Sequence, residues 1–216
     1  MHYRLIPNSF HFENLSLFNT SYRGLHMKNN TYENDVRILG GKFKGKLLPV
    51  LDVEGLRPTP SRVRETIFSW IKDSLGNAKV LDLFAGSGAL GLEAYSRGAK
   101  DVTLVELDKD NSSNLKEIAK SMSYDEIHVI NDDALNFLDN VSSTFNIVFI
   151  DPPYKLDIYE KVLEKLLDKN LIDDDSLIYV EMRNGSNKIV PGYEIIREEN
   201  AGQSKYSLWT KSKLLF

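Results

Sequence analysis

The chain has 216 residues, of which 27 are lysine or arginine and 31 are aspartate or glutamate, so its net charge is −4. It contains no cysteine, which excludes a disulfide scaffold, thiolate metal sites, iron–sulfur clusters and a cysteine nucleophile. No run of about 18 apolar residues is present, so we expect no membrane span and a cytoplasmic protein. The weak negative charge argues against a uniformly basic surface for nucleic acid, but it leaves room for a local basic patch.

The first 35 residues differ from the rest of the chain. Residues 1–26 are rich in serine, asparagine and aromatic side chains, and Glu13 is their single acid. A targeting peptide is one interpretation, although arginine is sparse and no apolar core precedes a small-residue cleavage site. The other is a poorly ordered extension, or translation that truly starts at Met27. We expect residues 1–35 to be a poorly ordered extension that ends in a polar linker.

Elements of secondary structure follow in a regular order from Val36 onward. Two short apolar runs between Arg37 and Val50 predict a β-hairpin with Gly40 and Gly41 in its turn. Ser61 is expected to cap a helix that reaches about residue 72. Strands and helices then alternate, and two β-like runs close the chain. The predicted strands are 79–84, 101–106, 127–130, 145–150, 177–181, 193–197 and 206–210, and the predicted helices are 88–97, 108–122, 134–138 and 156–167.

This alternation predicts an α/β fold with a mostly parallel sheet, helices on both faces and an antiparallel hairpin at the C-terminal edge. In such a sheet the ligand lies outside the carboxyl ends of the strands, near the point where the strand order reverses. Candidate functional residues are therefore sought directly after strands.

A glycine-rich loop, VLDLFAGSGALG, joins the strand at residue 79 to its helix. Gly86, Gly88 and Gly91 fit the dinucleotide pattern G-x-G-x-x-G, although a tight strand–helix turn needs no ligand. Asp82 would repel a pyrophosphate but suits a cationic ligand. Glu106 ends the next strand and can hold ribose hydroxyls. An acid at the position of Glu106 is shared by nicotinamide enzymes and methyltransferases, whereas Asp82 favours S-adenosylmethionine, whose methionyl amine is positive.

A second motif follows the apolar strand 145–150 and consists of Asp151, Pro152, Pro153 and Tyr154. The prolines fix φ and remove two backbone donors, so the loop presents hydrogen-bond acceptors beside an aromatic face. Asp151 and the Pro152 carbonyl can accept the N–H groups of an exocyclic amine, while Tyr154 stacks on its base. Such bonds favour a pyramidal nitrogen whose lone pair is directed at a sulfonium methyl group. A rigid strand-end turn is the structural alternative.

The glycine loop, Glu106 and the Asp-Pro-Pro-Tyr motif together resemble class I S-adenosylmethionine-dependent amino-methyltransferases. The segment 37–46, the run LRPTPSRVRETIF at 56–68 and FIDPPY resemble the RsmD family, which methylates N2 of one guanine in 16S ribosomal RNA. The resemblance extends from Val36 to the end of the chain. The Asp-Pro-Pro-Tyr motif also occurs in relatives that modify adenine or cytosine amines, so it leaves the base open.

The resemblance implies a Rossmann-like methyltransferase fold at 56–216 and an RNA-binding hairpin at 36–55. Asp151, Pro152, Pro153 and Tyr154 would receive a flipped guanine. Asp133, which is also a candidate helix cap, would meet the adenine of the cofactor. The implied cofactor-binding residues are Arg57, Pro58, Thr59, Asp82, Phe84, Ala85, Gly86, Ser87, Gly88, Glu106, Leu107, Asp133 and Ala134.

The charge is divided unevenly along the chain. Seven basic and two acidic residues lie between positions 37 and 64, so this window carries +5 and the remainder −9. Basic side chains there can contact phosphates, and Phe43 can stack on a base; a solvated strand face is the alternative. Beside a base-methylating site we expect RNA contacts from Arg37, Lys42, Phe43, Lys44, Lys46, Arg62 and Arg64.

Other classes of function fit less well. A DNA amine methyltransferase would need a target-recognition domain that the sequence lacks. A nicotinamide oxidoreductase offers no reason for the Asp-Pro-Pro-Tyr motif, and a non-catalytic RNA-binding module offers no reason for an intact Asp151. The four histidines show no ligand spacing, so we expect no metal. The expected partner is ribosomal RNA, within an assembling small subunit, and the expected state is a monomer.

Overall fold

The computed structural model describes residues 36–51, 59–123, 125–153, 155–186 and 189–213. The extension 1–35 and the site candidates Arg57, Pro58 and Tyr154 lie outside the described residues. The N-terminal hairpin and the main sheet belong to one compact unit.

Seven strands of the described chain form one sheet in the order β5-β4-β3-β6-β7-β9-β8. The five strands β5, β4, β3, β6 and β7 are parallel, and β9 runs antiparallel to both β7 and β8. The strand order reverses between β3 and β6, which is where ligands bind in open α/β sheets. The bounds are β3 (Lys79–Asp82), β4 (Asp101–Glu106), β5 (Ile127–Asn131), β6 (Phe145–Ile150), β7 (Ile172–Arg183), β8 (Tyr193–Ala201) and β9 (Ser204–Lys211).

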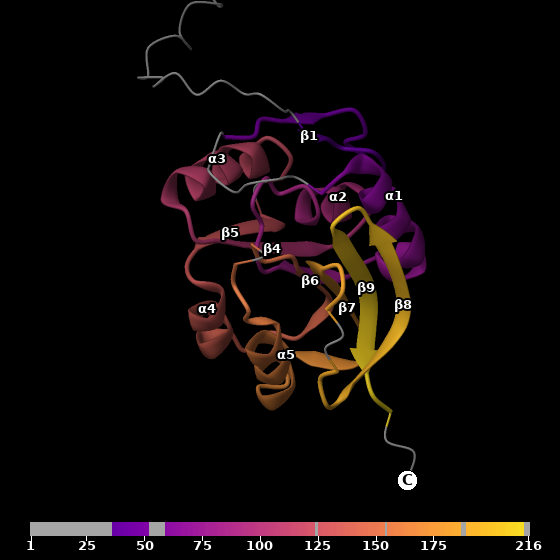
Figure 1. Cartoon of the computed structure of the whole chain (residues 1–216). Helices are drawn as coiled ribbons and strands as arrows, with labels where there is room; N and C mark the ends of the chain where they lie inside the picture. Colours follow the sequence, from indigo (N-terminus) through magenta and orange to yellow (C-terminus); the bar gives the residue numbers. More distant parts are fainter. Residues whose placement is uncertain (1–35, 52–58, 124, 154, 187–188, 214–216) are drawn as a thin grey trace, which may run out of the picture. The chain divides into compact units, whose positions relative to one another are not determined.

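Helices cover both faces of this sheet (Figure 1). One face carries α1 (Ser61–Trp70), α2 (Gly91–Ser96) and α3 (Lys109–Lys120), and the other carries α4 (Ala134–Asn140) and α5 (Tyr159–Asp168). A short 3₁₀ turn, Lys72–Ser74, follows α1. The predicted α/β architecture with its antiparallel edge hairpin is therefore confirmed. No helix in the described ranges has the length and apolarity needed to cross a membrane.

The predicted N-terminal hairpin is present, but its turn lies later than expected. Strands β1 (Val36–Arg37) and β2 (Leu47–Leu48) pair antiparallel, and the chain reverses at residues 42–45. Gly40 and Gly41 instead press against the end of α2. A Cβ on Gly41 would lie 1.7 Å from the Ser96 carbonyl oxygen, and the Lys42 N–H donates to that oxygen at 2.7 Å. The two glycines thus permit a close contact with α2 rather than the turn itself.

Several predicted boundaries also move. Ser61 is the first residue of α1, and Pro60 takes the cap position without a side-chain bond. Helix α2 begins at Gly91 rather than at residue 88, because the glycine loop stays in turn conformation through residue 90. Strand β7 spans twelve residues rather than the expected five, and its pairing with β6 changes register between Phe145 and Ile147.

Candidate active site

Three acidic side chains form a row across the carboxyl ends of β3, β6 and β7. Asp82 pairs in register with Phe149, and Phe149 pairs with Tyr179. Asp151 lies two residues beyond Phe149, and Glu181 lies two residues beyond Tyr179. Because side chains alternate along a strand, Asp82, Asp151 and Glu181 all point to the same face of the sheet. This is the face covered by α1 and α2, at the place where the strand order reverses.

The first carboxylate of the row, Asp82, is 2% exposed. Its Oδ2 accepts a hydrogen bond from the backbone N–H of Gly91 at 2.9 Å. A Cβ on Gly91 would lie 2.2 Å from Leu104 Cδ2, so only glycine lets α2 begin this close to the strand. Burial, aided by the charge of Glu106, raises the pKa of Asp82 to about 7 despite the bonds from the Gly91 and Phe84 backbone. A cation bound beside this carboxyl would relieve the cost of its burial.

Glu106, at the end of β4, holds the glycine loop in place. Its Oε2 accepts from the Gly86 N–H at 2.9 Å, and its Oε1 accepts from the Asp108 N–H at 2.8 Å. Burial raises the pKa of Glu106, while these backbone bonds oppose the rise. Each carboxylate oxygen has a second lone pair, so Glu106 can support the loop and still accept hydroxyl groups of a ligand.

The loop itself contains five of the predicted cofactor residues: Phe84, Ala85, Gly86, Ser87 and Gly88. Gly86 and Gly88 have φ values of 51° and 74°, in the left-handed region. A Cβ on Gly88 would also lie 2.7 Å from Leu92 Cδ1. Both glycines are therefore required for the loop to take this path between β3 and α2.

Asp133 caps the N-terminus of α4, which confirms the prediction that it is a helix cap. Its Oδ1 accepts from the N–H groups of Leu135 and Asn136 at 2.9 and 3.1 Å. Ala134 is buried as the first residue of the helix. Leu107 is 67% exposed directly after β4, which offers an apolar surface at the same edge of the sheet. Contact of these residues with an adenine ring stays a prediction.

Asp151 lies directly after β6 and is in contact with Thr59, which precedes α1. The Thr59 hydroxyl donates to Asp151 Oδ2 at 3.4 Å, and Thr59 is 8% exposed. Burial, followed by the charges of Glu181 and Asp82, raises the pKa of Asp151 well above its usual range. Pro152 is buried and Pro153 is exposed. The Pro153 carbonyl accepts from the Leu156 N–H at 2.8 Å and so shapes the loop.

Sequence reasoning missed Glu181. It is 6% exposed and accepts a hydrogen bond at 2.8 Å from the hydroxyl of Tyr179. The signal was an acid inside the apolar run LIYVEM near the end of a strand, the same pattern that singled out Asp82. Its neighbour in the sheet, Asp151, is 30 positions away in the sequence, and the adjacency comes from the pairing of β6 with β7.

Arg64 was predicted to belong to the basic surface, but its side chain is 2% exposed and lies in the interior of the protein. Its guanidinium donates to the carbonyls of Thr59 and Arg37 at 3.2 and 3.0 Å, and it lies 3.5 Å from Glu93. Position 64 belongs to the apolar face of α1, with Ile67 and Phe68. The helical spacing of that face was a signal that the count of charges ignored.

Glu93, which is fully buried on α2, completes this network. Its two carboxylate oxygens accept the N–H groups of Leu39 and Gly40 at 2.7 and 2.8 Å, and Arg97 Nε donates to it at 2.7 Å. The hairpin is thereby tied to α2 through Glu93. Through Arg64 it is also tied to Thr59, which contacts Asp151.

The remaining candidates for RNA contact lie at the surface. Arg37, Lys42, Lys44 and Arg62 are exposed, and Lys46 is half-buried. Phe43 is half-buried because its ring stacks on Tyr95 at 5.9 Å between centroids. These positions keep the hairpin available to a polyanion, although Phe43 already has an aromatic partner.

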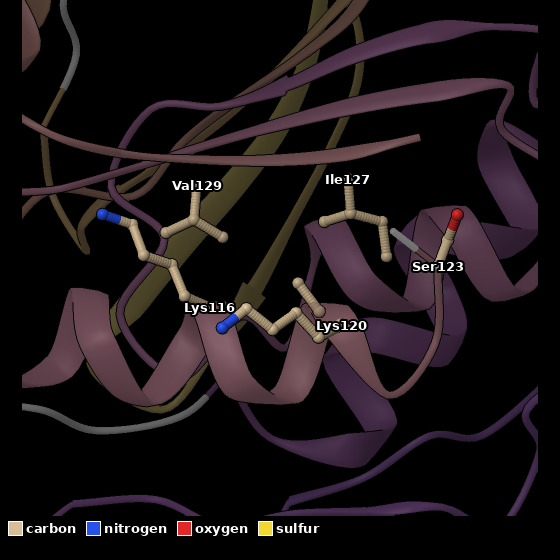
Figure 2. A pocket seen from close by; sticks show the side chains of 6 residues that line it. Lys116, Lys120, Ser123, Ile127 and Val129 are labelled. Atoms are coloured by element: carbon tan, nitrogen blue, oxygen red, sulfur yellow. The ribbon is translucent and has the colours of Figure 1, made fainter. Parts of the chain in front are cut away.

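A surface groove of about 270 Å³ lies elsewhere, between α3 and the edge strand β5. Figure 2 shows Lys116 and Lys120 of α3 reaching over it, with Ile127 and Val129 of β5 beside them. None of the predicted site residues lines it. Within the residues the structure describes, no group of histidine, aspartate and glutamate side chains is placed to hold a metal ion.

Comparison with known proteins identifies the family of this chain. The model of the family described as "Conserved hypothetical protein 95" matches residues 36–210. Ribosomal RNA small subunit methyltransferase D of Escherichia coli (strain K12) is 40% identical over 185 residues, which cover 85% of this chain and 93% of that protein. The chain belongs to the RsmD family.

Other members of the RsmD family extend the similarity. The Haemophilus influenzae protein of the same name is 39% identical over 182 residues, covering 82% of this chain and 94% of that protein. The solved structure of the "putative methyltransferase yhhF" from Escherichia coli is 39% identical, with a TM-score of 0.76 over 82% of this chain and 98% of that chain. The predicted Rossmann-like methyltransferase fold is thereby confirmed.

Proposed function

We propose that this protein transfers a methyl group from S-adenosylmethionine to the exocyclic N2 amine of a guanine in small-subunit ribosomal RNA. The observation that carries the proposal is the placement of Asp151 beside Asp82, at the reversal of strand order in the sheet. Relatives at 40% and 39% identity are named ribosomal RNA small subunit methyltransferase D, which supports ribosomal RNA as the substrate.

The residues at this edge fit S-adenosylmethionine. The buried carboxyl of Asp82, whose pKa is about 7, matches an ammonium group. The two left-handed glycines bring the backbone close to a ligand without a side chain between them. Glu106 can accept ribose hydroxyls, and Leu107 offers an apolar surface for adenine. When bound, S-adenosylmethionine supplies an electrophilic methyl group on a positively charged sulfur.

Asp82 would bind the cationic cofactor, and Asp151 would bind the amine that accepts the methyl group. A positive charge brought beside Asp82 and Asp151 lowers the pKa of both carboxyls and so favours their ionised forms. Ionised Asp151 accepts an N–H of the guanine amine and directs its lone pair. Transfer would replace the methyl carbon–sulfur bond of the cofactor with an N2–carbon bond and leave one proton in excess on N2, for which Asp151 would be the acceptor. Thr59, whose hydroxyl points to Asp151, orients this carboxylate.

The basic side chains of the N-terminal hairpin favour binding of a polyanionic substrate such as RNA. Exposed Lys42, Lys44, Arg37 and Arg62 would contact phosphates, and such contacts position the RNA rather than read its sequence. The buried network of Arg64 and Glu93 holds this basic surface at a fixed place relative to Thr59. We infer an assembling small subunit as the form in which the RNA is presented.

The direct test is methyl transfer from labelled S-adenosylmethionine to ribosomal RNA or small subunits that lack the modification. The expected product is N2-methylguanine at one position. Methyl incorporation into an adenine or cytosine amine would change the assigned base, and no product from RNA or subunits would refute the proposal. Mass spectrometry of ribosomal RNA from cells lacking the gene should show the loss of one methyl group.

Substitution of the acceptor sharpens this test. Asp151→Ala should abolish transfer while the affinity for S-adenosylmethionine, measured by calorimetry, largely survives. Asp73→Ala, an exposed aspartate after α1, is the matched control and should change neither quantity. Transfer by Asp151→Ala at a rate near that of the wild type would show that the role of Asp151 is wrong.

A further inference from the structure

Glu181 lies at the end of the acidic row, on the far side of Asp151 from Asp82. The pairing of Ile150 with Val180 places Asp151 and Glu181 side by side on neighbouring parallel strands. The hydroxyl of Tyr179, on the same strand and face, donates to Glu181 Oε2 at 2.8 Å. This bond occupies one of the roughly four lone-pair sites of the Glu181 carboxylate and fixes the orientation of the side chain beside Asp151.

Two neighbouring carboxylates can recognise a base that presents two adjacent hydrogen-bond donors, which a single acceptor cannot do. Guanine carries an N1–H donor directly beside its 2-amine, so it presents two donors in a row. Adenine and cytosine carry an unprotonated ring nitrogen, which is an acceptor, beside their amines. A carboxylate facing that ring nitrogen makes no hydrogen bond and is repelled by its lone pair. A second carboxylate next to Asp151 therefore matches guanine and disfavours the other two bases.

We propose that Glu181 determines the base, accepting the N1–H of guanine while Asp151 accepts an N–H of the 2-amine. This inference rests on the proposed function and adds the source of its base specificity. Tyr179 acts through Glu181 as a positioning residue. Burial, followed by the charges of Glu181 and Asp151, raises the pKa of the Tyr179 hydroxyl, which therefore stays protonated as a donor to Glu181.

The test combines one variant with one altered base. In 2-aminopurine the 2-amine is kept, but N1 carries no hydrogen and is an acceptor. RNA would carry guanine or 2-aminopurine at the nucleotide that the wild-type protein methylates, introduced by ligation of a synthetic segment. In Glu181→Gln the Tyr179 hydroxyl donates to the amide oxygen, so the amide N–H₂ is presented to the base. That group opposes the N1–H of guanine but can donate to N1 of 2-aminopurine.

The wild-type protein should prefer guanine to 2-aminopurine by about 100-fold in kcat/KM, because a buried carboxylate left without its donor is costly. Glu181→Gln should lower the guanine rate by about 100-fold and the 2-aminopurine rate far less, so that the preference narrows by at least tenfold. 2-Aminopurine lacks O6 as well as the N1 hydrogen. Loss of O6 should lower the rates of wild type and Glu181→Gln by the same factor, so a change in preference between the two proteins reports on N1. Glu164→Gln, the same change at an exposed position of α5, should leave the preference unaltered.

Each outcome has a separate meaning. If Glu181→Gln lowers both rates by the same factor, Glu181 is structural and the inference is wrong. It is also wrong if the wild-type protein methylates both bases equally. If the wild-type protein does not methylate guanine RNA at all, the proposed function itself fails. If Glu181→Gln does not fold, as judged by circular dichroism, Glu181→Asp replaces it. The shorter side chain holds its carboxylate further from the base, so the guanine rate should fall and the preference for guanine over 2-aminopurine should narrow. An unchanged preference would refute the inference.

Discussion

Replacing Asp82 with asparagine should stabilise the protein without cofactor and weaken the binding of cofactor. The carboxyl is 2% exposed, and burial raises its pKa from 3.8 to about 7. An asparagine of the same shape can still accept the Gly91 N–H through its amide oxygen. The asparagine side chain never ionises, so the variant avoids the destabilisation that a buried charge causes in the folded wild-type protein.

The magnitude follows from the pKa difference. Well below pH 3.8 the carboxyl of Asp82 is protonated in both the folded and the unfolded chain, and it makes no contribution to the pH dependence of stability. Between pH 4 and 7 the unfolded chain loses this proton while the folded protein keeps it, so the free energy of unfolding falls as pH rises. At 1.36 kcal/mol per pKa unit, the rise from 3.8 to about 7 corresponds to about 4 kcal/mol. About 2.5 kcal/mol of that loss falls between pH 5 and pH 8.

The assay is urea denaturation of the wild-type protein and Asp82→Asn at pH 5 and pH 8 without cofactor. The stability of the variant relative to wild type should increase by about 2.5 kcal/mol from pH 5 to pH 8. Asp73→Asn, at an exposed position, should show no such change. An equal difference at both pH values would refute the reasoning. By calorimetry, the affinity of the wild-type protein for S-adenosylmethionine should rise from pH 6 to pH 8, and the variant should lose both affinity and pH dependence.

Two further predictions concern the hairpin. Arg64→Leu should destabilise the protein by about 3 kcal/mol in urea, because it removes a buried cation from Glu93 and two donors from backbone carbonyls; Arg62→Leu, on the exposed face of the same helix, should cost less than about 0.5 kcal/mol. Replacing both Lys42 and Lys44 with alanine should weaken RNA binding and reduce the slope of log K against log salt by about 1.4 for single-stranded RNA, with cofactor affinity unchanged.

Different results would contradict these two predictions. Equal losses of stability for Arg64→Leu and Arg62→Leu would show that the buried network contributes nothing specific. An unchanged salt dependence in the lysine double variant, measured by fluorescence anisotropy with labelled RNA, would show that the hairpin does not contact phosphates.

Local patterns in the sequence carried much of the fold. The observed bounds of β4 and β6 are those predicted, because a run of apolar residues between turn residues depends on neighbours in the chain. Glu106 and Asp151 were found because parallel sheets bind ligands at their carboxyl ends, and each of these acids ends or directly follows a predicted strand. Asp82 was found as an acid inside an apolar strand just before the glycine loop. These inferences need only the order of elements.

The start of α2 and the turn of the N-terminal hairpin were predicted at the wrong residues because contacts between distant parts of the chain determine them. The start of α2 depends on Asp82, which holds the Gly91 N–H, and on Glu106, which holds the loop from another strand. Gly40 and Gly41 looked like turn residues, yet their lack of a side chain permits close contacts with Arg97 and Ser96, more than 50 positions away. Hydrogen bonds of this kind leave no periodic signal in the chain.

The sequence by itself determined the class of fold, the family and the charged residues available to the site. Only the tertiary structure decided which charges face solvent and which face one another. Arg64 was counted with the basic surface, but packing of α1 buries it against Glu93. Glu181 stood unremarked until the pairing of β6 with β7 set it beside Asp151. A residue's type is local information, whereas its burial and its partners are properties of the assembled sheet.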